Sequence, residues 1–151
     1  IGLAGIAQRQ PARIAFESPG PENENRAPGD PGAPDNSDID PTKLELAERI
    51  KSLMEKDRLF LQPDLNLREL AGQLQTGSPQ VSAAINQVFG KNFNEYVNGL
   101  RIEEFIRRYK EHGDTYTLLS LAYDSGFNSK ATFNLAFKKI RGSSPREFVR
   151  R

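Results

Sequence analysis

The chain has 151 residues, enough for one domain of ordinary size or for a smaller domain with a tail. It contains no cysteine and a single histidine, His112, which excludes disulfide bonds and a thiolate metal site and nearly excludes zinc chemistry. No apolar run approaches the roughly 20 residues that a membrane-spanning helix needs.

The overall net charge of +1 hides an uneven distribution of charge along the chain. Residues 1–40 carry three basic and seven acidic side chains, a net of −4, whereas residues 126–151 carry seven basic and one acidic, a net of +6. An excess of Lys and Arg at one end is typical of a domain that binds a polyanion there.

Residues 1–40 are rich in Pro, Gly and acidic residues and contain only scattered apolar ones. Such a segment cannot bury enough apolar surface to offset the entropy lost on ordering, so we predict a disordered linker. Calcium binding is the alternative role for its aspartates, but they lack the alternate spacing and the closing glutamate of a calcium loop. The aspartates in question are Asp30, Asp35, Asp38 and Asp40.

The apolar opening IGLAGIA has no initiating methionine, so a fragment of a longer protein and a processing remnant are both open interpretations. Because Arg9 and Arg13 follow it, the opening also fits the cytoplasmic exit of a membrane-spanning segment. We expect a cytoplasmic protein, with the cytoplasmic part of a membrane-anchored protein as the alternative.

The residues that follow predict an all-α domain over 41–151, with a first unit over 41–91. Apolar residues at helical spacing indicate three helices in this unit. Typical cap residues mark their starts: Asp40 with Pro41, Asn66 with Glu69, and Ser78 with Pro79. The second and third helices are short and joined by a tight turn, which is the pattern of a helix-turn-helix.

A longer linker helix is predicted over 92–112, with a capping box at its start. At about 100° per residue, its apolar residues from Phe93 to Leu100 cluster on one side, and those from Ile102 to Tyr109 on nearly the opposite side. A helix whose buried face switches halfway packs against two bodies, so we expect it to join two units. His112 lies at its end, where a basic capping role is favoured over a ligand role.

A second unit is predicted over 113–151. It begins with a short helix, and the turn DSGFNS leads into a longer one that Ser129 can cap. The expected inward residues of that helix are Phe133, Phe137 and Ile140, at three- and four-residue steps. We interpret the aromatic residues Phe133, Phe137 and Phe148 as core rather than as a surface on which bases stack.

The two units are copies of one pattern. Leu70 and Ala71 match Leu121 and Ala122 at an offset of 51 residues. From the next helix onward the offset is 52, and the matching pairs are Val81 with Phe133, Ile85 with Phe137, Gly90 with Gly142, Glu95 with Glu147, and Tyr96 with Phe148. The second copy therefore has one extra residue in its turn.

Residues 41–151 resemble the DNA-binding domain of the AraC/XylS family of bacterial transcription regulators. The segment LAYDSGFNSKATFNLAFKKIRGSSPREF carries the most specific part of the likeness. The resemblance implies two helix-turn-helix units joined by a linker helix, and sequence-specific binding near promoters. It also implies that both recognition helices enter successive major-groove segments on one face of DNA, and it leaves open whether the protein is an activator or a repressor.

The second helix of each unit presents its exposed N-terminal residues to base edges in such a motif. The candidates in the first unit are Ser78, Gln80, Ser82, Ala83 and Asn86. Those in the second unit are Ser129, Lys130, Thr132, Asn134 and Leu135, with Lys138, Lys139 and Arg141 as candidates for phosphate contacts. Gln80 and Asn86 could identify adenine, and the Thr132 methyl or Leu135 could touch a thymine methyl.

The expected partners are double-stranded DNA and, as further candidates, RNA polymerase and a sensor domain upstream of residue 1. No cofactor, no metal and no small-molecule site is expected. We do not expect an enzyme, because no nucleophile with a base, metal site or phosphate loop is recognisable, and Glu103 and Glu104 suit surface ion pairs with Arg107 and Arg108. A helical protein-interaction module that binds no DNA is the alternative function.

Overall fold

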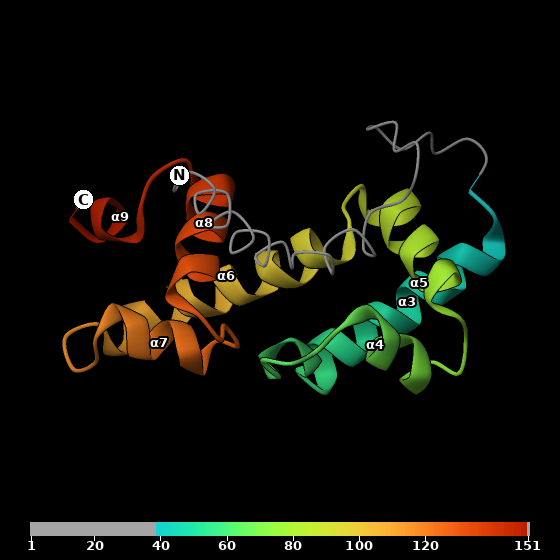
Figure 1. Cartoon of the computed structure of the whole chain (residues 1–151), viewed down its shortest axis with the longest axis horizontal. Coiled ribbons are helices and arrows are strands. Elements are labelled where there is room, and N and C mark those ends of the chain that lie inside the picture. The colour runs from blue at the N-terminus through green and yellow to red at the C-terminus, as the bar shows by residue number, and fades with distance from the viewer. Residues whose placement is uncertain (1–38, 151) are drawn as a thin grey trace, which may run out of the picture.

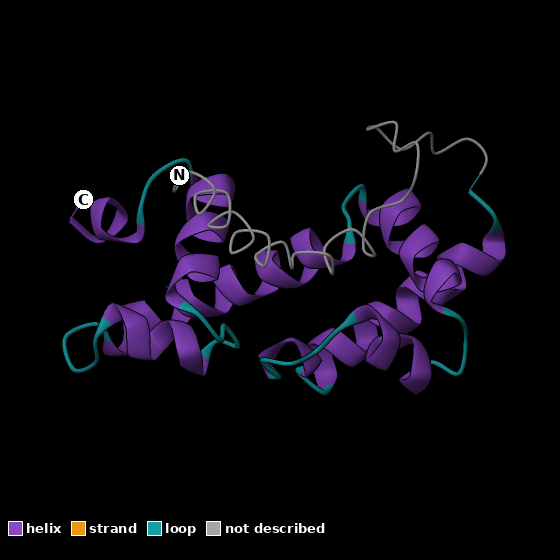
Figure 2. Cartoon of the chain, viewed as in Figure 1, coloured by secondary structure: helices purple, strands orange, loops and turns teal. Residues whose placement is uncertain are grey.

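The computed structural model describes residues 39–150. The predictions for the disordered linker, its aspartates and the apolar opening fall outside this range, apart from residues 39 and 40. Within it every regular element is helical, which confirms the all-α fold (Figure 2). None of the helices in this part of the chain combines the length and the apolar character needed to cross a membrane.

The elements follow one another with short connections. In chain order they are α3 (Pro41–Lys56), the 3₁₀ turn η2 (Leu59–Leu61), α4 (Leu67–Gln73), α5 (Ser78–Ala84), the π turn η3 (Ile85–Phe89), α6 (Phe93–His112), α7 (Leu118–Asp124), α8 (Lys130–Arg141) and α9 (Pro145–Arg150). Figure 1 shows α6 crossing the middle of the molecule, with α3 to α5 at one end and α7 to α9 at the other.

Two separate cores explain this two-ended shape. Leu70, Val81 and Ile85 belong to the first core, and α6 adds the side chains of Phe93 and Val97. The second core contains Phe133 and Phe137, and here α6 adds Ile102 and Phe105. The predicted switch of the buried face along the linker helix is therefore confirmed, and α6 is shared by both units.

The internal repeat is visible in the positions of the helices. α4 and α7 both have seven residues and start 51 positions apart, whereas α5 and α8 start 52 positions apart. Gly90 and Gly142, which end the paired segments, both have left-handed backbone, with φ of 68° and 78°. The register places the extra residue of the second copy at Asn128, immediately before the capping Ser129.

Hydrogen bonds at the helix starts follow the predicted caps. Asn92 Oδ1 accepts from the Glu95 N–H at 2.8 Å, and the Glu95 carboxylate accepts from the Asn92 N–H at 3.1 Å, which completes a capping box. Ser144 and Glu147 make the equivalent pair of bonds at the start of α9. The two boxes lie 52 residues apart, so the repeat extends to the caps.

One prediction about the core, the burial of Ile140, is wrong. Ile140 was expected on the inward face of α8, but 43% of it is exposed. It lies in the last turn of the helix, directly before the chain reverses at Gly142. Phe148 of α9 packs on Phe137, with ring centroids 5.4 Å apart, and covers the core there in its place.

Candidate nucleic-acid interface

α8, the helix predicted to be the second recognition helix, has a clear division into a buried and an exposed side. Phe133, Ala136 and Phe137 are buried, and the rings of Phe133 and Phe137 pack against Phe105 of α6. The predicted contact residues lie on the other side and are exposed in the structure: Lys130, Thr132, Asn134, Leu135, Lys138, Lys139 and Arg141. The amphipathic pattern of α8 thus holds the polar and basic residues outward.

Ser129, also predicted as a contact residue, is half-buried and serves as the cap of α8. Its hydroxyl oxygen accepts from the Thr132 N–H at 3.1 Å and its hydroxyl donates to the Thr132 Oγ1 at 2.9 Å. Both hydroxyl groups at the start of α8 are therefore engaged with each other, which fixes the first turn of the helix.

The first recognition segment, α5 followed by η3, presents its candidates less openly. Gln80 is exposed, whereas the other four are half-buried: Ser78, Ser82, Ala83 and Asn86. α5 packs closely against both α3 and α4, and Asn86 falls in the π turn. A π turn is rare and is frequently found at functional sites.

Gln80 lines a groove between the N-terminal end of α3 and the turn that joins α4 to α5. A side-chain carbon placed on Gly77 would collide with the Gln80 Oε1. Gly77 accordingly begins α5 without a side-chain cap, whereas Ser129 caps the matching helix in the second unit. The absence of a side chain at Gly77 leaves room for the Gln80 amide.

The basic residues of α8 differ in their intramolecular partners. Lys139 Nζ lies 2.6 Å from Glu95 Oε1 and so connects α8 to the start of α6. The Arg141 guanidinium lies over the Phe148 ring, 5.4 Å from its centroid. Within residues 39–150, Lys130 and Lys138 make no ion pair, and both remain available to an external anion.

Arg101 joins the two units at the point where the buried face of α6 switches. Its Nε donates to the Phe60 carbonyl at 2.8 Å and a terminal nitrogen donates to the Gln62 carbonyl at 2.7 Å. Its guanidinium also lies 5.8 Å from the centroid of the Phe127 ring in the second unit. Burial lowers the pKa of Arg101 to about 10, so the side chain stays charged at neutral pH.

The sequence did not predict that Arg101 connects the two units. One sequence feature could have identified it: Arg101 is a charged residue at the position where the buried side of the linker helix changes, between Leu100 and Ile102. The carbonyl groups that it binds belong to the loop around η2, about 40 residues earlier, and no periodic pattern points to them.

The turn before α8 completes this junction. Gly126 has φ of +106°, and a side-chain carbon there would collide with the Phe60 carbonyl oxygen and lie 2.8 Å from Arg101 Nε. Asn128, the extra residue of the second copy, donates from its amide to the Pro63 carbonyl at 3.4 Å. The loop around η2 in the first unit therefore contacts both α6 and the turn of the second unit.

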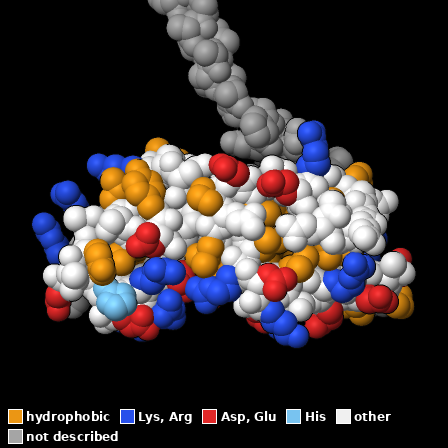
Figure 3. Space-filling view, turned by 90° about the horizontal axis from the view of Figure 1, so that it is seen from below, with side chains coloured by type: hydrophobic (Ala, Val, Ile, Leu, Met, Phe, Trp, Pro, Cys, Tyr) orange, Lys and Arg blue, Asp and Glu red, His pale blue; other side chains and the backbone are white. Residues whose placement is uncertain are grey.

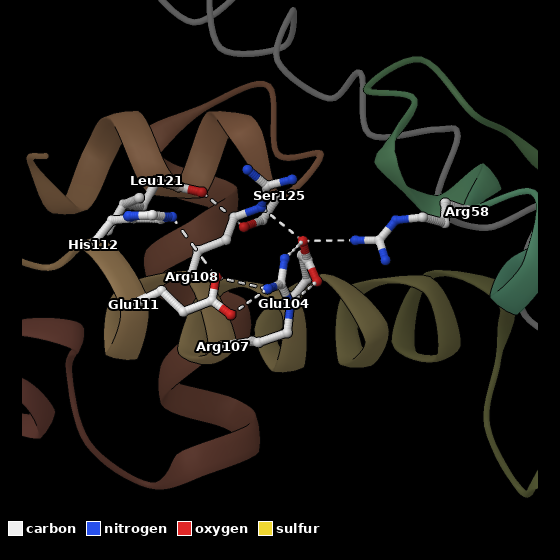
Figure 4. A network of polar contacts seen from close by, with 8 residues as sticks. All are labelled: Arg58, Glu104, Arg107, Arg108, Glu111, His112, Leu121 and Ser125. Carbon is white, nitrogen blue, oxygen red and sulfur yellow. Dashed lines mark hydrogen bonds and ion pairs between the residues drawn. The ribbon is translucent and has the colours of Figure 1, made fainter.

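Glu104 is the centre of a charged network that also spans the junction (Figure 4). One carboxylate oxygen lies 2.7 Å from Arg58 of the first unit and within 2.8 Å of Arg107 and Arg108 on α6. Burial alone would raise the pKa of Glu104, but hydrogen bonds from Arg107, Arg108 and Arg58 lower this pKa to about 2. The prediction of an exposed Glu104 is wrong, since only 5% of its side chain is accessible, whereas Glu103 is exposed.

The face seen from below, which carries α4 and α7, has mixed charge (Figures 1 and 3). Lys and Arg side chains are interspersed there with Asp and Glu side chains. A surface on which both signs alternate attracts a polyanion less than a run of unpaired lysines does. The unpaired lysines of α8 are therefore the better candidates for phosphate contacts.

These features define the class of protein: a helical domain built from two helix-turn-helix units. A family model described as a helix-turn-helix domain matches residues 70–151, more than half of the chain. The chain belongs to the AraC-type helix-turn-helix family of DNA-binding transcription regulators. A search of curated proteins gave no match.

Two solved structures share the fold. One is the C-terminal domain of AraT, a response regulator from Geobacillus stearothermophilus, with 24% identity and a TM-score of 0.58 over 76% of this chain and 88% of that one. The other is a protein of unknown function from Listeria innocua, with 20% identity and a TM-score of 0.58 over 67% of this chain and 91% of that one. At these identities the likeness supports the fold alone.

Proposed function

We propose that the chain binds DNA sequence-specifically and regulates transcription by reading two successive major-groove segments, one with α5 and the other with α8. The observation that carries this proposal is the repeat itself. Both recognition elements occupy matching positions in the two copies and flank one shared helix.

The dimensions of the shared helix are compatible with this arrangement. α6 has 20 residues and is therefore about 30 Å long. Successive major-groove segments on one face of DNA are about 34 Å apart. Two recognition elements held at either end of such a helix can reach both segments without a second copy of the protein.

The two recognition elements supply different chemistry to the proposed complex. α8 offers unpaired lysines for phosphates together with exposed residues for base edges, whereas residues 78–89 contain no basic side chain. We infer that α8 provides most of the affinity and that α5 adds discrimination through Gln80. The family's action at promoters also makes RNA polymerase and an upstream sensor domain candidate partners.

Selection from a random duplex library, followed by a mobility-shift titration at two salt concentrations, tests the proposal. We expect one duplex family to be enriched, and its affinity to fall steeply as salt rises. Failure to retain any duplex, even at low salt, would refute DNA binding and favour the helical protein-interaction module. Retention of all duplexes with equal affinity would refute sequence-specific reading.

A further inference from the structure

Leu135 is an unusual residue for the outer side of a recognition helix. It lies in the middle of α8 and 72% of it is exposed, more than any other large hydrophobic residue in the described part of the chain. Ala131, one turn earlier, is exposed as well. An apolar strip thus runs along the surface that carries the candidate contact residues.

The polar groups around this strip divide into engaged and unengaged ones. The hydroxyl groups of Ser129 and Thr132 are bonded to each other at the helix start. Asn134, adjacent to Leu135, is exposed, and its side-chain amide has no hydrogen bond to any residue in 39–150. Among the uncharged side chains in the middle of α8, an amide and an isobutyl group at consecutive positions are thus open to a base.

We propose that Leu135 packs on the C5-methyl group of a thymine in the major groove and that Asn134 pairs with an adenine beside it. The proposal rests on the DNA-binding function proposed above and specifies the sequence that α8 prefers. Thymine alone among the four bases presents a methyl group in the major groove, and an asparagine amide matches the N6 and N7 groups of adenine. The second unit therefore selects A·T base pairs.

The first unit offers a smaller apolar side chain at the matching position. The residue that matches Leu135 at the offset of 52 is Ala83, which is half-buried and has a side chain of one carbon. We therefore expect the stronger preference for the thymine methyl in the half of the site that α8 reads.

Replacing single thymines by deoxyuridine in the selected duplex tests the contact, because this change removes only the methyl group. Burial of one methyl group accounts for about a four-fold change in affinity. We expect one thymine at which deoxyuridine weakens binding of the wild type by about that factor. The Leu135→Ala variant should bind the thymine duplex several-fold more weakly than the wild type does. Replacing that thymine by deoxyuridine should not weaken binding of the variant further.

Ile140→Ala is the matched control, because it also shortens an exposed apolar residue of α8 but at the far end of the helix. It should keep the full response to deoxyuridine, and thermal unfolding should show that both variants fold. Tight binding without any position that responds to deoxyuridine would overturn the inference and leave DNA binding intact. A responsive position that persists in Leu135→Ala would also overturn it, and loss of all duplex binding by the wild type would refute the proposed function itself.

Discussion

The two recognition segments have the same length and opposite character. Residues 130–141 form one continuous α-helix whose outer side is exposed and carries Lys130 and Lys138, which form no ion pair within residues 39–150. Residues 78–89 begin as α5, change to a π turn, and contain no basic residue. The two segments therefore occupy equivalent positions in the two copies, but their exposed side chains differ in charge and accessibility. The comparison suggests a division of labour between an anchoring unit and a discriminating one.

The turns before the two segments differ in a way that positions them. The first turn ends at Gly77, which precedes α5, and the second contains the extra residue Asn128 and Gly126, whose φ of +106° only glycine adopts readily. These two residues contact the loop around η2 of the first unit, close to Arg101. The inserted residue thus contributes to the junction that orients one recognition segment relative to the other.

Gly126→Ala should have the largest effect on stability, because it disrupts the packing between the turn before α8 and the loop around η2. A side chain at φ of +106° is strained, and here it would also collide with the Phe60 carbonyl. We expect a loss of about 3 kcal/mol in the free energy of unfolding, measured by urea denaturation. Gly142→Ala is the control, since φ is +78° but no atom lies within 4 Å, and it should cost about 1 kcal/mol. Equal losses would show that the junction is not tightly packed.

Glu104→Gln should have the next largest effect, a loss of about 2 kcal/mol, because it leaves three arginines without their shared carboxylate. The folded-state pKa of about 2 lies below the ordinary 4.5, so the carboxylate stabilises the fold fully above pH 4.5. This contribution is lost as the pH falls from about 4.5 towards 2.

Urea denaturation of both proteins between pH 7 and pH 3 checks this prediction. The difference in stability between wild type and Glu104→Gln should shrink as the pH falls. Glu103→Gln, a change at the exposed neighbour, should cost less than about 0.5 kcal/mol at every pH. A difference that stays constant with pH would contradict the assigned ionisation of Glu104.

Lys138→Ala and Lys139→Ala separate an external from an internal role of two adjacent lysines. Lys138 has no partner ion in the described residues, whereas Lys139 pairs with Glu95. We expect Lys138→Ala to weaken all duplexes alike and to reduce the slope of log K against log[salt] by about 0.9. Lys139→Ala should change that slope less. The reverse order would place the phosphate on the side of α8 that faces α6.

Gln80→Ala should have the smallest effect on overall affinity, because residues 78–89 carry no charged side chain. We expect a loss of about 1 kcal/mol against the preferred base pair at one position of the site, with no change in the salt slope. Repeated library selection with the variant measures this. A uniform loss across all sequences would remove Gln80 from the base-reading surface.

Sequence could predict much of this fold because the two copies use local signals. Cap residues, the one-residue change of offset and the switch of faces along α6 are readable from spacing. The ion pairs of Glu104 with Arg107 and Arg108 follow from helical spacing and were predicted. The contacts of Arg101, and that of Glu104 with Arg58, were not predictable, because these partners lie in or just before the loop around η2 and are distant in the chain. Ile140 was assigned inward because helical spacing ignores the end of a helix, where Phe148 takes over the core.

The predicted contact residues lie on α5, η3 and α8 with its cap Ser129, but their accessibility could not be predicted from the sequence. Those of α8 are mostly exposed, and those of α5 and η3 are mostly half-buried because α3 and α4 pack beside them. Whether these residues touch bases stays a prediction.

Binding of half-site duplexes tests the division of labour most directly. The selected duplex is cut into the half whose preference changes in Leu135→Ala and the half whose preference changes in Gln80→Ala, and each is titrated against the intact duplex. We predict that the half read by α8 is still retained at low salt, whereas the half read by α5 is not. Equal retention of the two halves, or tighter binding of the half read by α5, would contradict the account.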